Sequence, residues 1–274
     1  SRVKVNLLME WGYLLAGLGV GIMVGMTGVG GGSLMTPILI FGFGIQPAIA
    51  VGTDLLFAAV TKAGGIWAYW RHGVVHWRVV WRLAAGSLPA TLLTLWFLSA
   101  TGVHEGKHND LITVALGIAL ILTSSALLLK NWLAGIMKAR QGHPLVNYLY
   151  RLRQDEALKA PATVIIGALL GVMVTLSSVG AGALGAVVLL FLYPKMRGVE
   201  IVATDIAHAV PLTAVAGLGH SAVGTVDWSL LSYLLMGSLP GIYIGSHLGV
   251  RISDKILRPL LAIILLMVGI KCLL

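Results

Sequence analysis

Long apolar stretches recur along the whole chain, separated by short polar segments. A helix needs about 20 apolar residues to cross about 30 Å of hydrocarbon. The recurrence of such stretches predicts an all-α integral membrane protein rather than a secreted domain behind one signal sequence. Eight stretches are long enough to span: residues 11–45, 48–70, 75–98, 111–129, 160–193, 199–221, 228–250 and 256–274.

Two of these stretches are too long for one straight helix. A helix over residues 11–45 would measure about 52 Å, and the stretch 160–193 is similar. Each must tilt strongly, protrude or break. The residues suited to a break are Gly28-Val29-Gly30-Gly31-Gly32 in the first stretch and Ser177 to Gly182 in the second. We therefore expect a broken or re-entrant hairpin in each.

The chain contains an internal duplication. Residues 50–89 align without a gap with residues 201–240. The aligned segments share a Thr-Asp pair, a Trp and the sequence Gly-Ser-Leu-Pro, which shared composition alone would hardly produce. We predict a single domain in which residues 1–130 form the N-terminal repeat and 160–274 the C-terminal repeat, joined by a basic, cytoplasmic connector over 131–159.

Basic residues favour one orientation of these halves, because Lys and Arg collect in cytoplasmic loops. If each overlong stretch crossed once, one side would hold twelve basic residues and the other six. If each returns to the side it entered, the counts become fourteen and four, with Lys62 inside the membrane. The second arrangement makes the halves inverted repeats, each a broken or re-entrant helical hairpin followed by three transmembrane helices.

The composition agrees with a membrane protein and limits which binding partners are expected. Of the 274 residues, 58% are hydrophobic and 11% charged, and the mean hydropathy is +0.93. The net charge of +9 fits cytoplasmic loops, so we expect the lipid bilayer and no nucleic acid as partners. The single Cys272 excludes an internal disulfide and a Cys-based metal cluster. We expect no metal site and no cofactor, and the sequence has no recognisable catalytic triad motif.

Inverted halves with interrupted helices are typical of secondary transporters, whose substrate lies near the midplane between the repeats. A break deep in the bilayer frees backbone N–H groups, and a helix that starts there offers about half a positive charge. Two such helices, starting near Ser33 and Ala183, predict a site for a small anion. Close helix packing is the alternative explanation, and it is preferred for Gly17, Gly21 and Gly25. The candidate binding residues of the breaks are Thr27, Gly28, Gly30, Gly31, Gly32, Ser33, Ser177, Ser178, Gly180 and Gly182.

These features together resemble the sulfite exporter TauE/SafE family. The resemblance rests on a glycine-rich break near the start of each half, the apolar segment Leu34-Met35-Thr36-Pro37, the Thr-Asp pair and the Gly-Ser-Leu-Pro pair. It covers essentially the whole chain, although Ser177, Ser178, Ala181 and Ala183 replace glycines or bulky apolar residues in the second break. The resemblance implies a multi-pass permease of the bacterial inner membrane that moves sulfite or small sulfur-containing organic anions, usually outward.

Lys62 is the most prominent charge within a predicted span. It lies 14 residues past Ala48, about 21 Å along the helix. A charge at that depth costs a few kcal/mol, so such a residue is a functional candidate. Its repeat counterpart is Thr213. The two halves therefore supply a single cation at this position, which is what a single bound anion would need. The alternatives are contact with the substrate, structural pairing with an Asp, and snorkelling to the interface, which the depth disfavours.

Asp54 and Asp205 are repeat equivalents, each following a Thr near the start of a helix. One interpretation is an N-terminal cap, or a carboxylate stabilised by the helix dipole, that fixes helix packing. The other is a proton site coupled to anion movement. His208 shares the face of Asp205 three residues earlier and is the best candidate for a proton relay. Protons are therefore a candidate partner beside the anion.

Two further classes of function stay open from the sequence. An anion channel or uniporter could be built on the same hairpins, since an inside-negative potential alone drives anions outward. A membrane assembly protein without transport activity is the other alternative. An enzyme is not expected, because no catalytic constellation or large soluble domain is visible.

Overall fold

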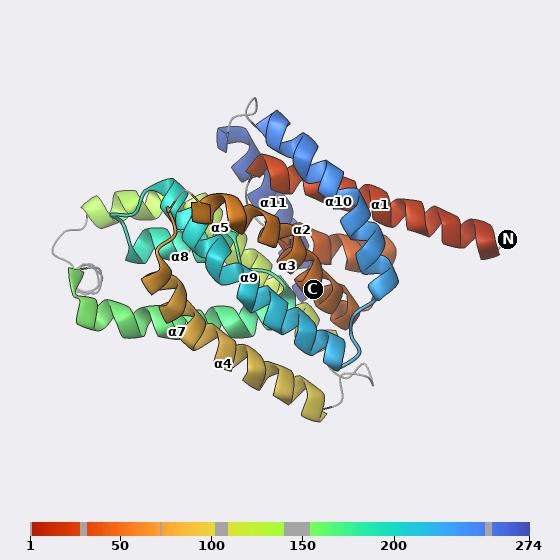
Figure 1. Cartoon of the computed structure of the whole chain (residues 1–274), viewed down its shortest axis with the longest axis horizontal. Helices are drawn as coiled ribbons and strands as arrows, with labels where there is room; N and C mark the ends of the chain where they lie inside the picture. Colours follow the sequence, from red (N-terminus) through yellow and green to blue (C-terminus); the bar gives the residue numbers. More distant parts are fainter. Residues whose placement is uncertain (1, 28–31, 72, 102–108, 140–153, 250–253) are drawn as a thin grey trace.

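The computed structural model of the chain describes residues 2–27, 32–71, 73–101, 109–139, 154–249 and 254–274, and within these ranges it is helical without a strand (Figure 1). The described helices confirm an all-α architecture, and most of them begin and end close to the predicted spans. The exceptions are the first helix, which begins at Arg2 rather than near residue 11, and the helix that ends at Ala139 rather than near residue 129. In chain order they are α1 (Arg2–Thr27), α2 (Gly32–Pro37), the π-helix η1 (Ile38–Gly42), α3 (Pro47–Arg71), α4 (Trp77–Thr101), α5 (Asn109–Ala139), α7 (Glu156–Ser177), α8 (Ala183–Leu192), α9 (Gly198–Ala222), α10 (Trp228–Gly249) and α11 (Asp254–Leu273).

Several helices are long and apolar enough to cross a bilayer. Among the described residues, five windows meet this condition, in α1, α4, α5, α7 and α9. Large apolar side chains point outward from these helices; Trp81 and Trp96 of α4, for example, are 69% and 70% exposed. A helix that is apolar on its outer face needs an apolar surrounding, so the exterior suits lipid rather than water.

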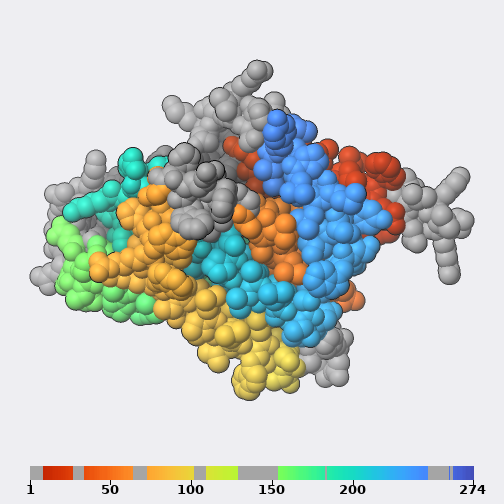
Figure 2. Space-filling view, viewed as in Figure 1, coloured from red at the N-terminus to blue at the C-terminus, as the bar shows by residue number. Residues whose placement is uncertain are grey.

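The contacts between helices follow the internal repeat: when two helices pack together, their counterparts in the other half pack together as well. Helix α1 packs on α10 as α7 packs on α4, and α3 packs on α9 and α5 on α11. Surfaces of α4 and α10 flank those of α3 and α9 (Figure 2). Corresponding helices also begin in the register of the sequence alignment: Gly32 with Ala183, Pro47 with Gly198, and Trp77 with Trp228.

Glycines let the two outer pairs approach closely. A Cβ atom added to Gly17 or Gly21 of α1 would collide with the backbone of α10. The related glycines of α7, Gly167 and Gly171, meet the backbone of α4 in the same way. The glycine of each Gly-Ser-Leu-Pro sequence lies in these same two contacts. The packing interpretation of Gly17 and Gly21 is thereby confirmed.

Helices α3 and α9 lie antiparallel at the centre and are tied to the opposite halves by two threonines. Thr53 of α3 accepts a hydrogen bond from the backbone N–H of Asp227, just before α10, at 3.1 Å. The repeat-related Thr204 of α9 accepts one from the backbone N–H of His76, just before α4, also at 3.1 Å. The threonines of both Thr-Asp pairs therefore join the two halves, while the aspartates are buried in the interior.

Helices α7 and α8 form a hairpin. The hydroxyl groups of Thr163, near the start of α7, and Tyr193, just after α8, lie 2.8 Å apart. The turn between the two helices occupies residues 178–182. Helix α7 rises about 21 Å from Thr163 to Ser177, so the turn lies deep in the protein relative to the two ends of the hairpin.

Candidate functional site

The second break is a tight turn that depends on backbone geometry. Ser178, Gly180 and Gly182 have positive φ angles of 58°, 116° and 134°. Residues with a side chain rarely adopt the last two, so glycine is required there. The carbonyl of Gly180 accepts a hydrogen bond from the N–H of Gly185 at 3.0 Å. That amide of the first turn of α8 is therefore not free for a ligand.

Lys62 joins this turn to α3. Its side chain is buried, with 6% of the residue exposed, and its Nζ donates a hydrogen bond of 2.5 Å to the carbonyl oxygen of Ala181. Among the described residues no carboxylate lies within ion-pair distance of it. Asp205 and Asp54 still act on the ammonium through space, Asp205 more strongly. Lys62 is therefore a buried cation whose direct partner is a neutral carbonyl.

Asp54 brings together segments from both halves. Its Oδ2 accepts a hydrogen bond of 2.5 Å from the hydroxyl of Thr36 in α2. The hydroxyl of Ser178 lies near enough to the same carboxylate to influence it. Neither Oδ1 of Asp54 nor Oγ of Ser178 has a hydrogen-bond partner among the described residues. Helix α2 and the turn between α7 and α8 thus meet at one carboxylate.

Asp205 occupies the related position in the second half. It is 2% exposed, and its Oδ1 lies against the first turn of α8, where a Cβ atom on Gly185 would collide with it. This oxygen also lacks a hydrogen-bond partner in the described part of the chain. The two related carboxylates thus each face the short helix of their own half, and each has a buried oxygen available for a ligand or a proton.

His208 connects these buried charged residues to α4. Its Nε2 lies 2.9 Å from the hydroxyl of Ser87, and Lys62 is near enough to act on the imidazole through space. His208 and Ser87 come from different halves, and the repeat counterpart of His208 is Phe57. His220 differs, since its two ring nitrogens lie 2.8 Å from the Thr225 hydroxyl and 2.9 Å from a backbone carbonyl, so its role is structural.

We call Asp54, Lys62, Asp205 and His208 the central cluster. None of them is more than 6% exposed, so an ion from solution can reach them only after helices move apart. With Lys62 charged and both carboxylates ionised, their summed charge is negative. Such a cluster can exchange a proton, hold an anion beside Lys62, or couple the two events.

The structure places the remaining predicted site residues in different ways. Gly28, Gly30 and Gly31 lie outside the described residues, as do the side chains of Thr27 and Ser33, while Gly32 begins α2. Ser177 uses its hydroxyl locally, donating to the carbonyl of Met173 at 2.6 Å and accepting from the N–H of Val179 at 3.2 Å. The cap interpretation of the aspartates is wrong, because both lie inside their helices and the N-cap of α9 is Arg197.

Sequence reasoning missed two partners of the central cluster. Thr36, which donates to Asp54, stands in the apolar segment Leu34-Met35-Thr36-Pro37, where no sequence pattern distinguishes it as a binding residue. Ser87, the partner of His208, belongs to a Gly-Ser-Leu-Pro sequence. The repetition of that sequence is a signal that Ser87 matters, but it does not identify the partner. That partner, His208 of α9, is replaced by Phe57 in the other half.

Comparison with known proteins gives one family and several relatives. The profile of the family described as sulfite exporter TauE/SafE matches residues 13–272. The probable membrane transporter protein YjnA of Bacillus subtilis is 38% identical over 263 residues, covering 96% of this chain and 99% of its own. YunE of the same organism, with the same description, is 26% identical and covers 93% and 94%. A probable membrane transporter protein of Methanocaldococcus jannaschii is 25% identical and covers 95% and 94%. No solved structure matches.

Proposed function

Because the chain belongs to the sulfite exporter TauE/SafE family, we propose that it is a secondary transporter that exports sulfite or a small sulfur-containing organic anion across the bacterial inner membrane. Two relatives that match nearly the whole chain are named probable membrane transporters, which supports transport. The apolar helices make it a multi-pass membrane protein. Its proposed function is to bind and release an anion rather than to catalyse a reaction.

The observation that carries the anion assignment is the position of Lys62. A buried ammonium group is costly unless it is well paired, and Lys62 is hydrogen-bonded to a neutral carbonyl at the turn between α7 and α8. An oxyanion that replaced the Ala181 carbonyl would form a stronger hydrogen bond, because the acceptor as well as the donor would then be charged. The free hydroxyl of Ser178 offers a second donor from the same turn.

An inverted arrangement of the two halves is supported by the directions of the helices. The repeat-related helices α3 and α9 are antiparallel, as their cross-half hydrogen bonds require. The ends of the α7–α8 hairpin lie together, which agrees with a segment that returns to the side it entered. Two inverted halves with the site between them allow alternating access by rocking one half against the other.

The charges of the central cluster favour coupling to protons over simple uniport. An anion beside Lys62 would also face Asp54 and Asp205, and three negative groups around one ammonium repel one another. Binding is therefore easiest when one carboxyl carries a proton. His208 and Ser87 offer a path for that proton toward α4. Asp54, Asp205 and His208 are accordingly the proposed coupling residues.

Flux through purified protein in lipid vesicles tests this function. Sulfite, sulfate, thiosulfate, taurine and sulfoacetate are compared as labelled substrates at a clamped membrane voltage. We expect saturable flux of sulfite or a sulfonate that is accelerated by unlabelled substrate on the other side and by a proton gradient. Saturation and counterflow distinguish a carrier from a channel. Vesicles in which none of the five compounds moves faster than in protein-free controls would contradict the proposal.

A further inference from the structure

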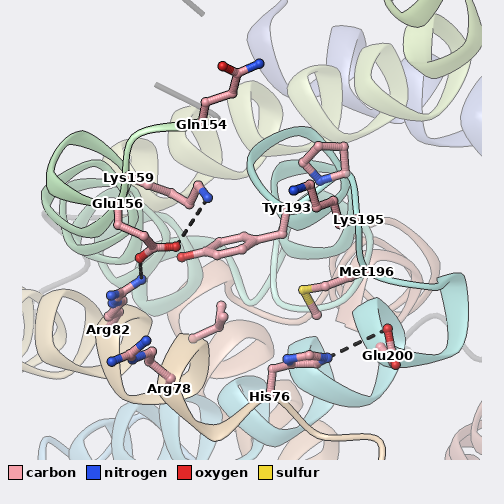
Figure 3. Close-up of a pocket in the computed structure, with 12 residues that line it drawn as sticks. His76, Arg78, Arg82, Gln154, Glu156, Lys159, Tyr193, Lys195, Met196 and Glu200 are labelled. Carbon is pink, nitrogen blue, oxygen red and sulfur yellow. Dashed lines mark hydrogen bonds and ion pairs between the residues drawn. The ribbon is translucent and has the colours of Figure 1, made fainter. Parts of the chain in front are cut away.

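A second polar site lies at the end of the molecule where α4, α7 and α9 begin. It is a pocket of about 710 Å³ whose lining includes no residue of the central cluster. Figure 3 shows the residues that line it. Four segments form it: the starts of these three helices and the segment between α8 and α9. Its charged lining consists of Arg78, Arg82, Lys159 and Lys195 against Glu156 and Glu200, with His76 beside them.

The acidic residues of this pocket are already paired. Glu156 binds Arg82 at 2.9 Å and Lys159 at 3.3 Å. Glu200 binds Arg197, which is outside the pocket lining, at 2.9 Å. It also lies 3.7 Å from the ring of His76 (Figure 3). Among the residues that the structure describes, Arg78 and Lys195 have no ion-pair partner. The lining therefore keeps an excess of positive charge in a concave site, which concentrates anions.

The pocket is close to the central cluster along α9. Glu200, in its lining, precedes Asp205 by five residues, a rise of about 7.5 Å. His76, also in the lining, donates its backbone N–H to Thr204, the residue next to Asp205. Along α9, the lining of the pocket therefore lies within about two helical turns of Asp205.

We propose that this pocket is the entrance on the connector side, where Arg78 and Lys195 bind the small oxyanion before it passes to Lys62. The proposal deepens the transport function above and depends on it for the second step, passage to Lys62. The ligand is a tetrahedral or pyramidal oxyanion such as sulfite or sulfate. A phospholipid headgroup carries the same chemistry, so the test must distinguish a free anion from an anionic lipid.

Binding to the pocket can be measured without transport. Lys62→Gln protein is placed in phosphatidylcholine nanodiscs and heated with sodium sulfite or with sodium chloride of equal ionic strength. Because a ligand stabilises the state that binds it, sulfite should raise the unfolding temperature of this protein. Adding Arg78→Gln and Lys195→Gln should abolish the rise. Adding Lys271→Gln, which removes a charge from α11 outside the pocket, should preserve it. No rise in Lys62→Gln, or an undiminished rise after both pocket substitutions, overturns the proposal.

Lipid composition separates the two sources of the ligand. The same measurement in phosphatidylglycerol nanodiscs should give the same sulfite effect, because the free anion is the occupant. If phosphatidylglycerol removes the effect, the pocket holds a lipid headgroup and the entrance assignment is wrong.

Flux measurements then test the role in transport. In vesicles of known orientation, Arg78→Gln/Lys195→Gln should raise the half-saturating sulfite concentration about fivefold on the connector side only, with an unchanged maximal rate and a weaker dependence on salt. Equal effects on both sides, or none, contradict the entrance. If wild-type protein moves none of the tested anions, the proposed function fails, and the nanodisc result still decides whether the pocket binds an anion.

Discussion

The ammonium group of Lys62 lies 2.5 Å from the carbonyl oxygen of Ala181, 119 residues further along the chain. This contact links a central helix of the first half to the turn of the hairpin in the second half. Movement of either segment removes the carbonyl from the cation. A carrier needs such an element, because the site must bind in one arrangement of the halves and release in another.

The turn itself gives a prediction about folding. Gly182→Ala should lower the free energy of unfolding by about 1–3 kcal/mol, because φ at this position is 134° and a Cβ atom is strained there. Chemical denaturation in detergent micelles measures the change. Gly198→Ala is the matched control, because a Cβ atom there meets no neighbour and its φ is not positive. Equal stability of Gly182→Ala and wild type would show that the turn differs from the one described.

The threonines that join the halves give a second prediction. Thr53→Val and Thr204→Val should each cost about 1–3 kcal/mol, because the backbone N–H of Asp227 or His76 loses its acceptor. The two losses should be similar, since the bonds are related by the repeat. Thr113→Val is a control, because that hydroxyl bonds a carbonyl of its own helix. A cost confined to one of the two central threonines would argue against equivalent roles.

Much of this architecture could be predicted from the sequence. The placement of most helices followed from the apolar stretches, and the start of α8 at Ala183 agrees with the expected break. The length of the second stretch forced an interruption, and the structure contains it at residues 178–182. These features depend on local composition and on bilayer thickness, which the sequence carries directly.

The partners of the central cluster could not be predicted in the same way. Asp54 meets Thr36 of α2 and lies near Ser178, which precedes α8. Such contacts depend on how separate helices cross, and a helical period does not contain that information. The sequence did place Asp205 within reach of Lys62 only across the repeat interface, and the structure brings them within electrostatic range there.

The hydrogen bond between Ser87 and His208 gives a prediction about protons. Ser87→Ala should slow proton-driven flux and shift its dependence on pH, because His208 loses the hydroxyl at 2.9 Å. Ser238→Ala is the repeat-matched control, since Ser238 bonds a carbonyl of its own helix at 3.3 Å. A purely structural role for Ser87 would lower the amount of folded protein and leave the pH profile of the remainder unchanged.

The carboxylates predict how anion affinity varies with pH. If one carboxyl must be protonated when the anion binds, sulfite affinity should fall as the pH rises. Asp205→Asn should flatten this dependence, because asparagine presents no negative charge at any pH. Asp54→Asn is the companion variant, and comparison of the two identifies the coupled group. The measurement is equilibrium binding of sulfite at several pH values, corrected for the ionisation of sulfite itself. Coupling through these residues is contradicted if neither variant alters the slope.

Equilibrium binding of sulfite with and without Lys62→Gln, measured in Arg78→Gln/Lys195→Gln protein so that the pocket does not contribute, tests the central claim most directly. Both proteins should fold. Lys62 has no carboxylate in direct contact, so its replacement leaves no buried partner that has lost an ion pair. The account predicts that Lys62→Gln weakens binding at least about tenfold through loss of a charge-assisted hydrogen bond, while Lys271→Gln leaves binding unchanged. Unchanged sulfite affinity in a folded Lys62→Gln protein would contradict the account.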